Sequence, residues 1–267
     1  MKTLQELSNL KGRVALITGG AGHIGSVLAE ALAEQGADVI VLDLNRNRCE
    51  LKAKAINRRF KVKALPLMAD LTKDEAVRGV PTFAKEKFGR LDILINCAAL
   101  VGTSALKGWA VPLPQQDIHT WRLALEVNLT STFSLIQATQ NLLAKSGHGS
   151  IINIGSIYGM VGPDMSLYEG TGLGNPAAYA ASKGGLLQLT RWFATVLAPK
   201  IRVNMISVGG VFRHQQKPFL NRYAQRTPLR RMATEEDLKG AASYLASDLS
   251  NYVTGHNLVV DGGWTAW

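Results

Sequence analysis

The chain has 267 residues, of which 46% are hydrophobic and 19% charged, and its formal net charge is +10. This composition is typical of a globular protein, and the length is enough to bury a core without a disulfide or metal staple. No run approaches eighteen apolar residues and no secretory leader is evident, so we expect no membrane partner and a cytoplasmic location. The two cysteines, Cys49 and Cys97, form no spacing motif, which fits a reducing compartment and predicts no metal site.

Short β-rich runs alternate with helical patterns along the chain. Strands are predicted at 13–18, 37–43, 62–70, 91–99, 150–156, 201–207 and 257–263. Helices are predicted at about 22–36, between the second and third strands, and at 72–88, 117–145, 177–198 and 234–247. This alternation predicts an α/β fold: one Rossmann domain over 1–267, with a doubly wound parallel sheet of about seven strands and helices on both faces.

Three stretches, 100–116, 158–176 and 209–231, fit neither pattern, and each follows a predicted strand. Ligands bind at the carboxyl edge of such sheets, and long loops there are usually functional. We interpret 158–176 as a substrate loop and 209–231 as a lid.

The sequence TGGAGHIG at 18–25 places Gly20, Gly22 and Gly25 at G-x-G-x-x-G spacing between a strand and a helix. A helix that begins there directs free N–H groups at a phosphate. Asp43 ends the next strand, where a carboxylate can bind ribose hydroxyls and repel a 2′-phosphate, which favours NAD. Arg46 and Arg48 favour NADP instead, and a cap on the following helix is a competing role for Asp43.

Tyr179 and Lys183 lie four residues apart on a predicted helix and so share a face. An ammonium beside a phenol stabilises the phenolate, so we expect the pKa of Tyr179 to fall from about 10 toward neutrality. A hydroxyl at Ser156, which ends a strand, is placed to hold a substrate oxygen, and Asn128 falls in the long helix before that strand. Each residue has an ordinary structural explanation, but their joint occurrence favours catalysis.

Taken in order, these landmarks resemble the short-chain dehydrogenase/reductase family over essentially the whole chain. The family implies hydride transfer between an alcohol and a carbonyl, with Tyr179 as general acid/base and Lys183 lowering its pKa and holding the nicotinamide ribose. It implies that Ser156 orients the substrate oxygen and that Asn128 positions a water in a proton relay. The residues that it implies for cofactor binding are Gly19, Gly22, His23, Ile24, Gly25, Asp43, Asp70, Leu71, Asn96, Ala98, Tyr179, Lys183, Gly209 and Val211.

Three positions depart from the family pattern: His23 and Ala99 stand for glycines, and Val208 stands for a proline. The glycine spacing is that of the family's extended, sugar-nucleotide branch, whereas the length and the position of Tyr179 fit the shorter type. His23 has two open interpretations, one beside the cofactor pyrophosphate and one pointing to solvent.

The long interval between Ser156 and Tyr179 and the ending VVDGGWTAW resemble short-chain enzymes of flagellin modification and gluconate 5-dehydrogenases. This favours a sugar, sugar acid or sugar phosphate as substrate. The candidate substrate residues are Ser156, Tyr168, Glu169, Arg213 and His214. The family implies a homotetramer, and the aromatic tail with Trp264 and Trp267 has two open roles, packing on a neighbour or on its own subunit.

Two other functions remain open, an NADPH-dependent 3-oxoacyl reductase and a non-catalytic dinucleotide-binding protein. Positive charge gathers within 46–63 and 213–231, where solvated faces or attraction for anionic ligands are the main interpretations. No zinc-finger spacing, recognition helix or aromatic-interleaved basic run is present, so we expect no nucleic-acid partner.

Overall fold

The computed structural model describes residues 1–267 and has a single seven-stranded sheet at its centre. The strands are β1 (Val14–Thr18), β2 (Asp38–Asp43), β3 (Ala64–Met68), β4 (Ile93–Asn96), β5 (Gly149–Ser156), β6 (Ile201–Val208) and β7 (Asn257–Val260). All neighbours pair in parallel in the order β3-β2-β1-β4-β5-β6-β7. The predicted sheet and fold class are therefore confirmed.

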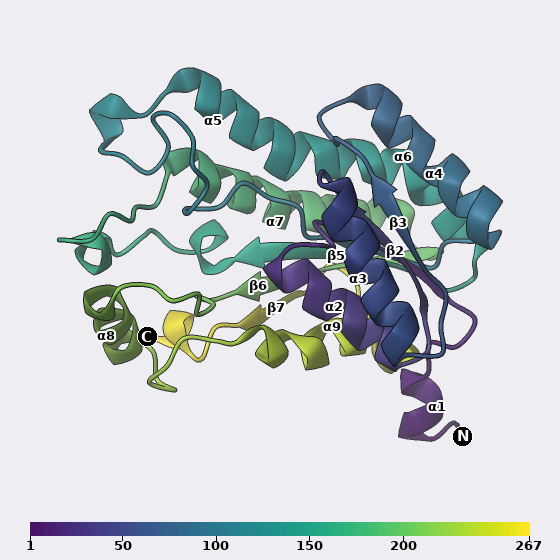
Figure 1. The fold of residues 1–267 in the computed structure, drawn as a ribbon. Helices are drawn as coiled ribbons and strands as arrows, with labels where there is room; N and C mark the ends of the chain where they lie inside the picture. The colour runs from purple at the N-terminus through teal and green to yellow at the C-terminus, as the bar shows by residue number, and fades with distance from the viewer.

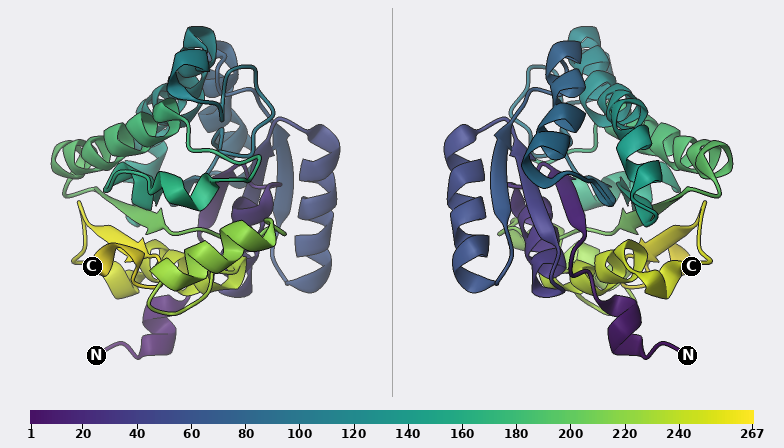
Figure 2. Two further views of the ribbon diagram at one scale, coloured as in Figure 1. Left: turned by 90° about the vertical axis from the view of Figure 1, so that its left-hand side faces the viewer. Right: turned by 90° about the vertical axis from the view of Figure 1, so that its right-hand side faces the viewer.

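Helices cover both faces of the sheet, as Figures 1 and 2 show. One core joins the sheet to α2 (His23–Glu34), α3 (Arg46–Arg59) and α9 (Lys239–Ala246). A second core joins the opposite face to α4 (Asp74–Phe88), α6 (Ser131–Lys145) and α7 (Ala177–Leu197). The remaining helices are α1 (Leu4–Ser8), α5 (Ile118–Leu125) and α8 (Lys217–Arg226). None of the helices combines the length and apolarity that a bilayer crossing requires.

The central strands read as unbroken apolar runs because alternate side chains enter the two cores. In β1, Ala15 and Ile17 belong to the first core, whereas Val14 and Leu16 belong to the second. Side chains of successive strand residues point to opposite faces, so a strand covered on both sides is apolar at every position. The helices over 22–36 and 177–198 were recognisable from a different pattern, because each has a single apolar stripe that faces the sheet.

Three helical segments differ from the sequence predictions. The helix expected over 117–145 is interrupted by a π-helical turn, Glu126–Thr130, between α5 and α6. The stretch 209–231 contains α8, whose Phe219 and Tyr223 are buried four residues apart while Lys217 and Arg226 are exposed. The last predicted helix begins as a 3₁₀ turn, Glu235–Leu238, before α9.

The sheet order positions the site. From β1 the chain moves outward through β2 and β3, and from β4 it moves the other way to β7, so the direction reverses between β1 and β4. Such a reversal leaves a crevice at the carboxyl ends of the strands, the usual ligand site of this architecture. The three long loops expected to be functional, 100–116, 158–176 and 209–231, all follow carboxyl ends of strands.

Candidate active site

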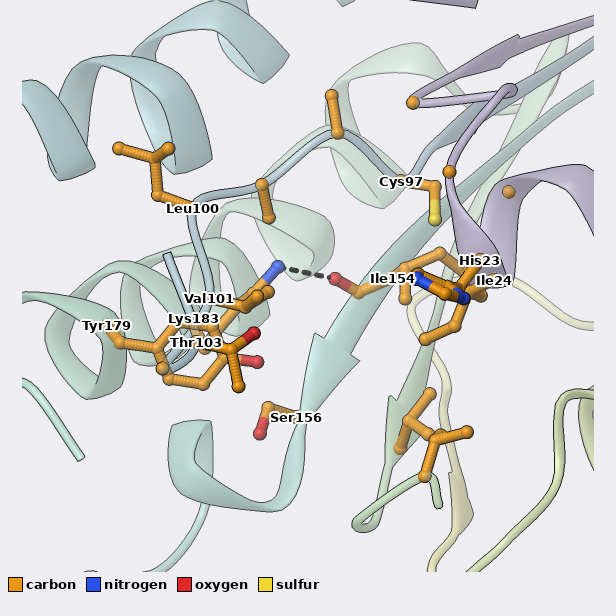
Figure 3. A pocket seen from close by; sticks show the side chains of 18 of the residues that line it. His23, Ile24, Cys97, Leu100, Val101, Thr103, Ile154, Ser156, Tyr179 and Lys183 are labelled. Carbon is orange, nitrogen blue, oxygen red and sulfur yellow. Dashed lines mark hydrogen bonds between the residues drawn. The ribbon is translucent and has the colours of Figure 1, made fainter. Parts of the chain in front are cut away.

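A cavity of about 710 Å³ lies at the carboxyl edge of the sheet (Figure 3). Its volume falls in the usual range for ligand sites. It brings together most of the predicted site residues: Gly19, Gly22, His23, Ile24, Gly25, Asp43, Asp70, Leu71, Ala98, Ser156, Tyr168, Tyr179, Lys183, Gly209, Val211 and Arg213. Four predicted residues, Asn96, Asn128, Glu169 and His214, do not line it.

The glycine loop packs the start of α2 against the end of β1. A Cβ on Gly25 would lie 2.2 Å from the Gly19 carbonyl oxygen, so only glycine allows this approach. Gly19 adopts φ +61°, a conformation that favours glycine. The first-turn amides of His23 and Ile24 make no hydrogen bond within the chain. Free amides and the positive helix end fit the pyrophosphate of a dinucleotide.

His23 is the first residue of α2; its side chain is exposed and lines the cavity (Figure 3). Both interpretations of His23, beside the pyrophosphate or pointing to solvent, stay open, because the exposed imidazole also lines the cavity. Its backbone contributes to the helix start, and its imidazole stands at the cavity rim in contact with solvent.

The Asp43 carboxylate is held by the glycine loop and does not cap α3. It accepts the Leu44 N–H at 2.8 Å and the Ala21 N–H at 3.2 Å. The α3 cap is Asn45, whose side chain accepts the Arg48 N–H at 3.0 Å. The competing cap role is therefore wrong, because the Asp43 carboxylate turns back toward α2. Arg48 also lines the cavity, so the Arg48 guanidinium and the Asp43 carboxylate face the same end of the cavity.

Ser156, Tyr179 and Lys183 meet at the opposite end of the cavity (Figure 3). Ser156 ends β5, and its Oγ accepts the Tyr158 N–H at 3.2 Å. Lys183 is 4% exposed, and its Nζ donates to the Ile154 carbonyl oxygen at 2.8 Å. This ammonium lies 5.8 Å from the centre of the Tyr179 ring, so the helical spacing does place the two side chains together.

The ionisation of this group differs from the sequence prediction. Burial raises the pKa of Tyr179 above its usual value, and the nearby Ser156 hydroxyl and the charge of Arg213 only partly oppose the rise. Burial also lowers the pKa of Lys183 to about 8. The expected fall in the Tyr179 pKa is therefore wrong for the cofactor-free chain, because desolvation outweighs the neighbouring charges.

The two predicted asparagines organise the site from behind the cavity wall. Asn128, 1% exposed, lies in the π-helical turn and accepts the Leu100 N–H at 2.7 Å. Its amide donates to the Leu100 carbonyl at 3.0 Å and to Ser182 Oγ at 3.1 Å. Asn96 donates to Asn153 Oδ1 at 2.8 Å between β4 and β5. Asn128 thus holds the loop that lines the cavity, and Asn96 links the ends of β4 and β5.

Two of the predicted substrate residues point elsewhere. Glu169 is exposed, and its carbonyl accepts from Arg222. His214 is exposed with φ 58°, and its ring packs against Phe212 at 5.2 Å between centroids. A tight turn at 211–215 directs Arg213 inward and His214 outward, an alternation that the sequence alone does not show.

Three residues in or beside the cavity escaped the sequence reasoning: Thr18, Cys97 and Asn175. Thr18 Oγ1 accepts the N–H groups of both Cys97 and Ala98 at 3.0 Å. Burial raises the pKa of Cys97, which lines the cavity, to about 11. Asn175 lines the cavity as well, with both amide atoms buried and unpartnered. Asn175 precedes Pro176, the N-cap of α7, so it lies outside the helix and helical spacing gave no signal for it.

The aromatic tail packs on its own subunit. Trp264 stacks on Tyr223 of α8 with ring centroids 4.5 Å apart, and Trp267 Nε1 donates to the Arg226 carbonyl at 3.1 Å. Tyr223 in turn accepts the Gly210 N–H through its hydroxyl. The tail therefore supports the lid segment, which was one of its two open roles.

Comparison with known proteins gives consistent results. A family model described as enoyl-(acyl carrier protein) reductase matches residues 19–265. The trans-4-hydroxycyclohexanecarboxylate dehydrogenase of Sinomonas cyclohexanicum is 35% identical over 260 residues, covering 95% of this chain and 93% of that protein. The post-translational flagellin modification protein A of Campylobacter coli is 29% identical and covers 96% and 99%.

A solved structure adds the same likeness in three dimensions. It is a gluconate 5-dehydrogenase from Burkholderia cenocepacia in complex with NADP and tartrate, with a TM-score of 0.86 and 29% identity. The alignment covers 99% of this chain and 100% of that chain. The two groups that the sequence resembled, flagellin-modification proteins and gluconate 5-dehydrogenases, are thus both among its relatives.

Proposed function

The chain belongs to the short-chain dehydrogenase/reductase family, and on this premise we propose that it interconverts a secondary alcohol and a ketone on a sugar, sugar acid or sugar phosphate with NAD. Its general class is that of oxidoreductases acting on CH–OH groups with NAD(P). One observation carries the proposal: Ser156, Tyr179 and Lys183 share a single cavity with the glycine loop.

In the proposed mechanism, Tyr179 is the general acid and base. During oxidation its Oη accepts the proton of the substrate hydroxyl, and during reduction it returns that proton. Ser156 Oγ holds the substrate oxygen beside the phenol. A nicotinamide cofactor bound along the glycine loop would supply or accept the hydride. Lys183 would hold the cofactor ribose and stabilise the phenolate, and Asn128 acts indirectly by fixing the loop at Leu100.

The preference for NAD rests on Asp43. Its carboxylate is fixed by two backbone amides at the end of β2, where a 2′-phosphate would bring negative charge close to it. Arg48 lines the same end and is the observation that favours the second candidate, an NADPH-dependent 3-oxoacyl reductase. Fluorescence titration with NADH and NADPH separates the two, since much tighter NADPH binding would reject the role given to Asp43.

The substrate class is supported by the polar groups of the cavity and by relatives that act on polyhydroxylated or hydroxylated acids. The decisive test is a screen with NAD(H) and NADP(H) over sugars, gluconate, sugar phosphates, 4-hydroxycyclohexanecarboxylate and a 3-oxoacyl thioester. Turnover of the hydroxylated compounds with NAD is the expected result. Turnover of the thioester alone, or of no compound in the panel, would reject the proposal.

The role of Tyr179 is tested by Tyr179→Phe, which removes one oxygen and little volume. We expect kcat to fall about 100- to 10,000-fold, the usual contribution of a positioned acid or base, while NADH affinity stays within about threefold. Tyr252→Phe is the matched control because Tyr252 is fully exposed and lies outside the cavity. A Tyr179→Phe enzyme with the wild-type rate would remove Tyr179 from this role.

We also propose that the protein works as a homotetramer in the cytoplasm, without nucleic-acid or membrane partners. The exposed apolar side chains Phe133, Trp192 and Val196 lie on the neighbouring helices α6 and α7 and support assembly through that face. Light scattering on Trp192→Glu tests this, because a buried charge at an interface should reduce the measured mass. An unchanged mass would exclude this face.

A further inference from the structure

Near Tyr179 the cavity contains a cation that the proposed chemistry does not use. Arg213 lines the cavity, and its guanidinium donates no hydrogen bond within the chain. Its Nε is buried and lies 3.5 Å from Glu235 Oε1, beyond a strong charge-assisted bond. The Glu235 carboxylate therefore orients one edge of the guanidinium, while the terminal nitrogens remain available.

The backbone around Arg213 is well fixed. The Arg213 N–H donates to Gln215 Oε1 at 2.7 Å, and Gln215 Nε2 donates to the Val211 carbonyl at 2.9 Å. The Phe212 N–H donates to the Ala233 carbonyl at 2.8 Å. A guanidinium held this way loses less freedom when it binds a ligand, which favours affinity.

Arg213 also lies near the reacting end of the cavity. Burial raises the pKa of Tyr179 and of Cys97, and the charge of Arg213 acts against the rise in both cases. The other charged side chains of the cavity are His23, Asp43, Arg48 and Asp70 at the glycine-loop end, and Lys183, which is bound to the Ile154 carbonyl. Arg213 is thus the cation near Tyr179 whose terminal nitrogens have no partner, although its Nε edge pairs with Glu235.

A second unpartnered group faces the same space. Asn175 has both amide atoms buried without a hydrogen bond, although it is close enough to Tyr168 to oppose the rise in pKa that burial gives that phenol. It stands where the main cavity meets a neighbouring groove of about 590 Å³ lined largely by apolar side chains. Buried polar atoms without partners are costly, so a site that contains two such groups fits a ligand that satisfies them.

We propose that Arg213 and Asn175 form a carboxylate-binding subsite, so that the substrate is a hydroxy acid bearing one carboxylate. The planar guanidinium binds a carboxylate through two parallel N–H donors, and the Asn175 amide donates to the same group or to a neighbouring hydroxyl. With Glu235 already paired to its Nε edge, Arg213 suits a monoanion better than a phosphate dianion. This inference rests on the proposed function and narrows its substrate class.

The test compares acids with their neutral amides. We would measure kcat/KM for 4-hydroxycyclohexanecarboxylate and gluconate, and for the corresponding carboxamides, with wild type, Arg213→Gln, Arg213→Lys and Asn175→Ala. Wild type should prefer the acids, and Arg213→Gln should lower kcat/KM for them about 100-fold, as the loss of two charge-assisted bonds implies. Arg213→Lys should recover only part of the lost kcat/KM, because an ammonium lacks the two parallel N–H donors of a guanidinium.

Arg78→Gln is the matched control. Arg78 is exposed on α4, makes no ion pair and does not line the cavity, so its removal should leave the preference for acids intact. Equal loss of preference in this variant would mean that net charge rather than the subsite attracts the acids. A wild-type preference for carboxamides or sugar phosphates would also overturn the proposal.

A binding experiment separates this inference from the proposed function. Cyclohexanecarboxylate, which has no hydroxyl to oxidise, should bind wild type and lose at least tenfold in affinity with Arg213→Gln and with Asn175→Ala in calorimetry. Arg213-dependent binding without turnover would reject the function and keep the subsite. Turnover with equal binding of this probe to all variants would reject the subsite and keep the function. If Arg213→Gln fails to fold, Arg213→Lys and Asn175→Ala decide the matter alone.

Discussion

Asn128 offers a prediction whose size follows from its contacts. The side chain is 1% exposed and makes three hydrogen bonds, two with the Leu100 backbone and one with Ser182. Asn128→Ala removes all three and leaves the Leu100 N–H and carbonyl without partners. At about 1 kcal/mol for each bond, the free energy of unfolding should fall by about 3 kcal/mol. For a chain of this size, the midpoint of thermal unfolding should drop by about 6–12 °C.

The assay is urea and thermal unfolding followed by circular dichroism, with kcat/KM measured on the same samples. Gln137→Ala is the matched control because Gln137 is exposed on α6 and its side chain makes no hydrogen bond; its stability should change by less than about 0.5 kcal/mol. Since Leu100 lines the cavity, Asn128→Ala should also lower kcat/KM. A loss of stability below about 1 kcal/mol would refute the idea that Asn128 holds this loop.

Three further predictions concern the same cavity. Gly25→Ala places a Cβ 2.2 Å from the Gly19 oxygen and should weaken NADH binding at least about 100-fold, as measured by fluorescence titration. The control Gly79→Ala adds a Cβ in open space and should leave NADH affinity unchanged. Equal NADH affinities for the two variants would contradict the packing role of Gly25. Burial lowers the pKa of Lys183 from 10.5 to about 8, so Lys183→Met should stabilise the cofactor-free protein by about 3 kcal/mol below pH 8. This gain in the free energy of unfolding should vanish as the pH rises toward 10.5. A stability difference in urea unfolding that does not change with pH would count against the prediction. Arg213→Gln should raise the pKa of Tyr179 further, so the acidic limb of the kcat/KM profile for oxidation should move to higher pH, and an unmoved limb would place Arg213 away from Tyr179.

The sheet and most helices could be predicted because their signals are local. Residues in β1 alternate between two cores, and this produces an apolar run that any single sequence displays. The helical spacing of Tyr179 and Lys183 likewise brings both side chains to one face without reference to the rest of the chain. The glycine loop could be read for the same reason, since a close approach of helix and strand demands residues without a Cβ.

The features that escaped prediction depend on distant parts of the chain. The π-helical turn around Asn128 exists where α5 meets α6, and its side chain is satisfied by Leu100 and Ser182, which are remote in sequence. The direction of the Tyr179 pKa depends on desolvation by the folded cavity, which spacing alone cannot express. The short helix α8 was missed because its apolar side is only two buried residues wide and its other positions mix basic, polar and small residues.

The hydroxyl of Thr18 has a consequence for how ligands enter. By accepting two amides from the segment after β4, it ties the two sides of the crevice together where the chain direction reverses, so this edge should open only in slow, larger fluctuations. The lid segment is held by the pairing of Val211 with Ala233, by Arg222 on three carbonyls within 166–169 and by the stacking of Tyr223 on Trp264. Within it, the backbone N–H groups of 214–216 make no hydrogen bond. Hydrogen exchange should therefore be slow at Cys97, Ala98 and Phe212 and faster at 214–216, so that the cavity admits substrate by local opening of this turn while the dinucleotide half stays rigid.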